Sequence, residues 1–142
     1  MNEYLTKKDV TEKILAQGLY SLKYIKRQKN TIKEGLLRGI LSNIQGTILT
    51  IETIVEAMKG SEKFTDSEIV SMYEDIISNN EEPMSYKTME DFGFVRGDNI
   101  PFKNLKEEIN YFTLITRLEN SGISKTKILL IKKRTIKIWK DV

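Results

Sequence analysis

The sequence predicts an all-α fold: a single helical-bundle domain around a long central helix, with a basic C-terminal element. Three observations support this prediction. Apolar residues recur at helical spacing through residues 32–59. Helix-capping pairs, in which Thr or Asn precedes Asp or Glu by three residues, occur at four places. The 142 residues include two prolines, Pro83 and Pro101, and both fall in the one stretch with an irregular pattern.

The capping pairs and the glycines place the helices in order along the chain. We expect helices over 6–28, 32–59, 66–78, 85–92 and 105–120, with a turn-rich link over 93–101. The expected N-terminal caps are Thr6, Thr31, Thr65 and Asn104, and the expected stops are Gly60 and Gly122. Residues 124–140 are favoured as helix through Arg134. Their Ile and Thr content leaves a final β-hairpin as the alternative, and 135–140 stay open between helix and strand.

The central helix carries two different faces. Its apolar residues follow alternating gaps of four and three, and they are Leu37, Leu41, Ile44, Ile48, Ile51, Val55 and Met58. Small residues form a second face, and they are Gly35, Gly39, Ser42, Gly46, Thr53 and Ala57. Because each mid-helix Gly costs about 1 kcal/mol relative to Ala, we expect another backbone to approach closely there. The partner is either helix 6–28, folded back within one bundle, or a second copy in a homodimer through helix 32–59.

The charge is divided among three parts of one expected domain, 1–142. Residues 1–59 carry a net charge of +4, residues 60–108 carry −7 and residues 109–142 carry +6. We therefore expect a helical hairpin with possible dimerisation in 1–60, an acidic helix and a turn-rich link in 61–103, and the basic element in 104–142. A basic–acidic–basic order indicates separate surfaces for different partners.

The missing residue types exclude most catalytic chemistry. The chain has no His and no Cys, which removes His-dependent triads, thiolate nucleophiles and the usual zinc sites. No phosphate-binding loop of the Walker type occurs, and acidic pairs such as Glu74-Asp75 are adjacent, so that their side chains diverge on a helix. We expect no enzyme activity, no cofactor and no metal.

The composition also bears on location and origin. The first eight residues lack the apolar stretch of a signal peptide, and the longest aliphatic run is Ile128–Ile131. A membrane span needs about 20 apolar residues, so we expect a cytoplasmic protein with no membrane partner. The abundance of Ile and Lys is typical of an A+T-rich genome, such as that of a low-GC bacterium or its phage.

The C-terminal element is the main functional candidate. Residues 121–131 resemble the turn and second helix of a helix-turn-helix. Gly122 permits the left-handed backbone of a tight turn, and Ser124 can cap the second helix. Ile128 and Ile131 then face inward, while the outward positions are Lys125, Thr126, Lys127 and Leu130. The alternative is another core helix after an ordinary helix end.

Charge points to the same element. Residues 125–140 hold seven cations and no acidic residue, a density typical of phosphate binding. We expect Lys125, Thr126 and Lys127 to approach bases and the following cations to hold phosphates: Lys132, Lys133, Arg134 and Lys137. The alternative is a solvated basic face. Helix 6–28 offers a second basic side with Lys23 and Arg27, where Tyr20 and Tyr24 either stack on bases or cover the core edge.

These observations favour a small nucleic-acid-binding regulator, with DNA as the favoured partner, possibly dimeric and carried by a phage or mobile element. The alternative is a non-catalytic inhibitor or adaptor that binds a host protein, for example a phage protein that blocks a defence enzyme. It would use the acidic residues of 60–108 or the apolar helix face. A purely structural assembly subunit would also fit the long apolar face.

Overall fold

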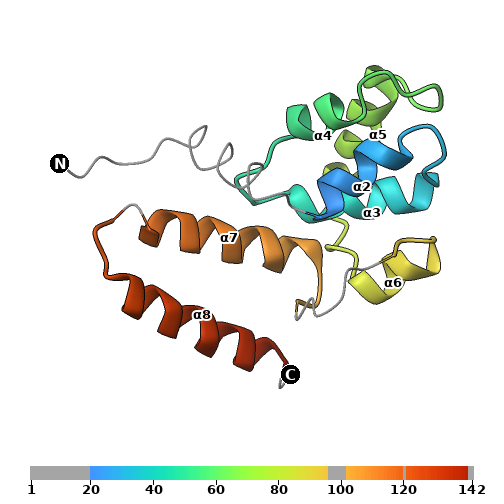
Figure 1. Cartoon of the computed structure of the whole chain (residues 1–142). Helices are drawn as coiled ribbons and strands as arrows, with labels where there is room; N and C mark the ends of the chain where they lie inside the picture. Colours follow the sequence, from blue (N-terminus) through green and yellow to red (C-terminus); the bar gives the residue numbers. More distant parts are fainter. Residues whose placement is uncertain (1–19, 96–101, 120, 141–142) are drawn as a thin grey trace.

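The computed structural model describes residues 20–95, 102–119 and 121–140, and for Tyr20 and 134–140 it describes the backbone alone. Within these ranges the chain forms seven helices and no strand (Figure 1). They are α2 (Tyr20–Gln28), α3 (Glu34–Ile44), α4 (Ile51–Ala57), α5 (Asp66–Ser78), α6 (Tyr86–Asp91), α7 (Leu105–Glu119) and α8 (Lys125–Lys140). The predicted all-α class is confirmed. No described helix combines the length and apolar character that crossing a membrane requires.

Helix α3 lies at the centre of the packing. It contacts α4, α5, α6 and α7, whereas α2 packs on α4 and α8 packs on α7. From Leu36 to Ile44 the side chains of α3 are buried except that of Arg38. Burial of large aliphatic side chains from several helices against one central helix supplies the main stabilising contribution to such a fold.

The single long helix predicted over 32–59 is wrong, because the chain breaks between α3 and α4. Gln45 ends α3 with an extended backbone, and Gly46 has a φ of +73°, which glycine adopts without strain. The Thr47 hydroxyl then donates to the Ile44 carbonyl at 2.6 Å, which satisfies one orphan group of the helix end. Ile48 and Leu49 are still buried, so the apolar spacing continues through the break although the helix does not.

The small-residue face of α3 receives side chains rather than another backbone. A Cβ added at Gly35 would overlap the Phe92 ring, and one added at Gly39 would lie 2.5 Å from Met84 Sδ. The expected close backbone approach is therefore corrected: the glycines accommodate side chains from α6 and its flanks. The homodimer through 32–59 stays a prediction, since a single chain does not test it.

Three of the four expected caps fall within the described residues. Thr65 and Glu68 form a reciprocal capping box at α5, with distances of 3.2 and 2.9 Å. The Asn104 side chain accepts a hydrogen bond from the Glu107 amide at 2.9 Å near the start of α7. The Thr31 cap is wrong, because α3 begins at Glu34 after Lys33, which provides no side-chain cap. The Thr6 pair lies outside the described residues.

Asn43 joins three parts of the chain from a fully buried position. Its Nδ2 donates to the carbonyls of Gly39 and Met84 at 2.7 and 3.0 Å, and its Oδ1 accepts from the Lys106 amide at 2.9 Å. One side chain on α3 thus holds both the segment before α6 and the first turn of α7. Because a buried amide must be paired, this arrangement fixes where those two segments sit.

Candidate nucleic-acid interface

The turn between α7 and α8 has the features predicted for it. Gly122 has a φ of +84°, and the Ser121 amide donates to the Leu118 carbonyl at 3.1 Å, which closes the end of α7. The Ser124 hydroxyl accepts from the Lys127 amide at 3.2 Å, which is an N-cap at the start of α8. In Figure 1 α8 runs back along α7 in the opposite direction, and the two helices are in contact. The pair therefore forms a helical hairpin.

The isoleucines whose side chains are described in this element face inward, as their spacing predicts. Ile128 is buried, and Ile123 and Ile131 are half-buried and pack against the core. These three side chains attach α8 to the core. Leu129 and Leu130 contribute less to this packing, because they are 53% and 47% exposed. The outward position of Leu130 agrees with the prediction. The exposure of Leu129 was not predicted. The sequence did contain a signal for it, because Leu129 directly follows the buried Ile128 and neighbouring residues of a helix point in different directions.

The structure describes the side chains of some cations of α8 and not of others. Lys125, Lys127 and Lys133 are exposed together with Thr126, while Lys132 is half-buried. The side chains of Arg134 and Lys137 lie outside the described residues. The backbone of α8 is helical through Lys140, which settles 135–140 as helix and shows that the β-hairpin alternative is wrong.

Lys23 and Arg27 are exposed on α2, but the structure does not bring them next to the cations of α8. Helix α2 packs on α4, and Figure 1 shows α8 at the opposite side of α7. The Tyr24 hydroxyl donates to the Gly93 carbonyl at 3.1 Å, and its ring meets Phe94 edge-on at 5.0 Å. Tyr24 therefore covers the edge of the core, the alternative that sequence left open, rather than presenting its ring to bases.

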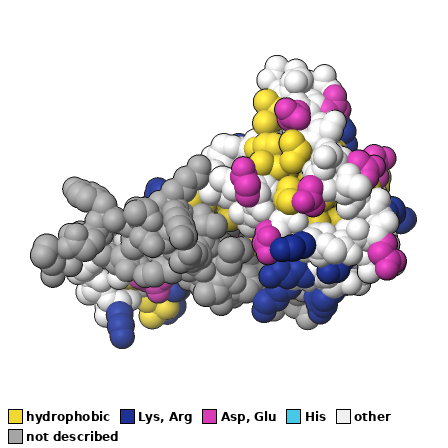
Figure 2. All heavy atoms as spheres, turned by 90° about the horizontal axis from the view of Figure 1, so that it is seen from above, with side chains coloured by type: hydrophobic (Ala, Val, Ile, Leu, Met, Phe, Trp, Pro, Cys, Tyr) yellow, Lys and Arg dark blue, Asp and Glu magenta, His cyan; other side chains and the backbone are white. Residues whose placement is uncertain are grey.

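Charge is unevenly distributed over the described surface. Figure 2 shows a face on which lysine and arginine side chains gather at one part, while acidic side chains are spread over much of the rest. The acids of α5 are exposed, and they are Asp66, Glu68, Glu74 and Asp75. The exposed lysines of the basic C-terminal element, Lys125, Lys127 and Lys133, lie on a different helix, α8.

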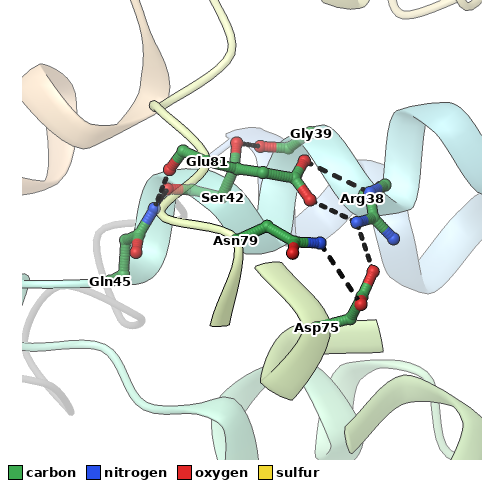
Figure 3. A network of polar contacts seen from close by, with 7 residues as sticks. All are labelled: Arg38, Gly39, Ser42, Gln45, Asp75, Asn79 and Glu81. Carbon is green, nitrogen blue, oxygen red and sulfur yellow. Dashed lines mark hydrogen bonds and ion pairs between the residues drawn. The ribbon is translucent and has the colours of Figure 1, made fainter. Parts of the chain in front are cut away.

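Arg38 is a cation that the chain itself neutralises. Its guanidinium pairs with Asp75 at 2.6 Å and also with Glu81, and both carboxylates raise the pKa of Arg38 above its usual range (Figure 3). Asn79 holds Asp75 with a hydrogen bond of 3.3 Å, and Gln45 donates to the Glu81 carbonyl at 2.6 Å. This network ties α3 to α5 and to the following loop. A paired guanidinium of this kind is not offered to phosphate.

Glu108 is a buried acid whose carboxylate accepts a hydrogen bond from a tyrosine hydroxyl. The Tyr86 hydroxyl donates to its Oε2 at 2.9 Å, between α6 and α7. Burial raises the pKa of Glu108, and the hydrogen bond from Tyr86 lowers it in part. With 5% of Glu108 exposed, this carboxyl has no open approach for a substrate. Among the described residues no group of three or more acids is placed to hold a metal ion.

Comparison with known proteins adds no assignment. The chain matches no protein-family model, no curated protein and no solved structure. Among the described residues, the exposed cations of α8 are the strongest functional feature.

Proposed function

We propose that the chain is a small nucleic-acid-binding regulator, with DNA as the favoured partner, and that α8 makes the contact. The observation that carries the proposal is a helix with exposed cations and no acid of its own: Lys125, Lys127 and Lys133 are exposed, and no Asp or Glu occurs in α8. Such cations displace counterions from phosphates, which favours binding. Thr126, exposed in the first turn, has the position from which a recognition helix reaches base edges.

The remaining cations have different places in this proposal. Lys132 is half-buried, and Arg134 and Lys137 extend the basic series of α8 in sequence. We assign all three to phosphate contact. Lys23 and Arg27, on α2, would serve only as a separate phosphate contact, because α2 and α8 lie apart (Figure 1). The proposal does not depend on them.

A salt titration tests the proposal. Fluorescence anisotropy with a labelled DNA duplex, repeated with single-stranded RNA, gives the affinity between about 50 and about 200 mM salt. We expect the triple variant Lys132→Gln, Lys133→Gln and Arg134→Gln to bind more weakly. The slope of log affinity against log salt should fall by about 3, one unit for each lost phosphate contact.

The matched control changes the same charge elsewhere. Lys59, Lys63 and Lys87 are exposed outside α8, and their triple substitution by Gln should leave the salt slope unchanged. Equal weakening by the two triples would mean that net charge, rather than α8, drives binding. Absence of binding at low salt for both duplex DNA and RNA would overturn the proposal.

A protein-binding inhibitor or adaptor is the second candidate, and the acidic outer side of α5 favours it. Asp66 and Glu68 are exposed, and Glu68 lines a groove of about 470 Å³ whose apolar lining includes Phe64 and Met72. For this role, reversal of Asp66 and Glu68 to Lys should abolish recovery of a defined partner from host lysate. It should leave the anisotropy of the labelled duplex as it is in the wild-type chain, which separates the two candidates.

A further inference from the structure

A groove lies where α7 ends and α8 begins. It has a volume of about 490 Å³ and is lined by Glu119, Ile123, Lys125, Ile128, Leu129 and Lys132. Three of these side chains are apolar, two are cationic and one, Glu119, is acidic, so the cations outnumber the acid. Leu129, 53% exposed, is apolar surface that the described part of the chain leaves uncovered. A partly apolar groove with two lysines suits a helix that combines apolar and acidic side chains.

The outer face of α5 has that combination. Val70, Tyr73, Glu74 and Ile77 fall at positions i, i+3, i+4 and i+7, so they share one side of the helix. Val70 and Ile77 are exposed at 36% and 46%, Tyr73 is half-buried, and Glu74 is exposed between them. Figure 2, which looks down on the side where α4 and α5 lie, shows apolar and acidic side chains exposed next to one another.

The groove and the α5 face complement each other but cannot meet within one chain. Both present apolar side chains to solvent, the groove contributes two lysines against one acid, Glu119, and the face contributes Glu74. Figure 1 shows α5 and α8 at opposite ends of the described structure, with α3 and α7 between them. Only another copy of the chain can bring the two surfaces together.

We propose that the α5 face of one copy docks in the α7–α8 groove of a second copy. Ile77 and Val70 would cover Leu129, and Glu74 would pair with Lys125 or Lys132. Because two different surfaces meet, two joined copies together keep one free groove and one free face. The contact therefore builds rings or open chains of copies rather than a closed two-fold dimer. It requires no nucleic acid.

Sedimentation velocity over a range of protein concentrations tests this contact on the full chain, after nuclease treatment. For the wild type at low salt we expect species heavier than the 16.5 kDa monomer, growing with concentration and shrinking at high salt. Glu74→Lys or Lys132→Glu alone should weaken association by at least about tenfold, because like charges then face each other. Glu82→Lys, the same change at an exposed acid outside the face, should leave association unchanged.

A mixture of the two single variants gives the sharpest result. The face altered by Glu74→Lys is cationic and fits the groove that Lys132→Glu has made acidic. The unaltered face of the second variant still fits the unaltered groove of the first. We therefore expect the mixture to regain association that grows with concentration, with the two variants alternating, although each variant alone does not associate. Unfolded variants could not rescue one another, so the rescue also excludes misfolding.

Four outcomes would overturn the proposal. The first is a wild-type chain that stays monomeric at every concentration in low salt. The second is association that neither charge reversal affects. The third is a mixture of the two variants that associates no more than each variant alone. The fourth is a closed two-chain species of the wild type that does not grow with concentration, which would favour the dimer through residues 32–59 instead.

Discussion

The α3-centred core and α8 are two helical regions built in opposite ways. On α3 the apolar side chains are buried, and the polar ones are tied to distant segments, as Asn43 is to Met84 and Lys106. On α8 Ile128 is buried, whereas both following leucines and most described lysines are exposed. The difference shows that internal packing accounts for the composition of α3 and for only part of the composition of α8.

The largest expected effect tests this contrast with one chemical change at two places. Leu41→Ala in α3 removes a fully buried side chain and should lower the free energy of unfolding by about 3 kcal/mol or more. Leu130→Ala in α8 should change it by less than about 0.5 kcal/mol, because Leu130 is half exposed. Urea denaturation followed by circular dichroism measures both. Similar losses at the two positions would break the comparison.

A smaller loss is expected from removing the polar centre of the core. Asn43→Ala leaves the Lys106 amide and the Met84 carbonyl without their side-chain partner and should cost about 2 kcal/mol. The control is Asn79→Ala, since Asn79 is exposed and makes a 3.3 Å bond to Asp75. Its cost should stay below about 0.5 kcal/mol in the same denaturation experiment. An equal cost for both would mean that Asn43 does not join the three segments.

The smallest expected change in stability is at Glu108, and there the substitution should raise stability rather than lower it. Because burial raises its pKa in the folded state, the folded chain holds a proton that the unfolded chain has lost. Stability therefore falls as pH rises from the ordinary Glu value through the raised one. Glu108→Gln keeps an acceptor for Tyr86 and should remove that fall, so the variant gains stability over the wild type with rising pH.

Melting temperatures of the wild type and of Glu108→Gln, measured across this pH range, test the expected gain in stability. Glu82→Gln is the control, because Glu82 is exposed. It should follow the wild-type curve throughout. If Glu108→Gln also follows that curve, the carboxyl of Glu108 does not carry the expected penalty.

Local signals in the sequence predicted much of the fold. Thr65 with Glu68 gives the start of α5, and Asn104 with Glu107 gives the region where α7 begins. Gly122 and Ser124 likewise predict the turn into α8. These features depend on residues a few positions apart, and a single sequence shows them directly.

Non-local features escaped prediction for a physical reason. The break at Gly46 was hidden because Ile48 and Leu49 stay buried on the far side of it, which preserves the apolar spacing of a continuous helix. The pairing of Arg38 with Asp75 joins residues 37 positions apart, and spacing carries no information about such contacts. In the candidate site, the lysines of α8 were predicted from charge. The groove beside Leu129 could not be predicted from the sequence, because it depends on how α7 and α8 pack against each other.

The glycines of α3 have a consequence for how the protein can be altered. In an exposed helix, replacing Gly by Ala adds about 1 kcal/mol of stability. At Gly35 the added methyl group would meet the Phe92 ring, so the strain would fall on the end of α6 rather than on α3. The usual helix-strengthening exchange would thereby loosen a different helix, and faster amide hydrogen exchange would appear in α6 while α3 stayed protected. The surface of α3 therefore determines how firmly α6 is held.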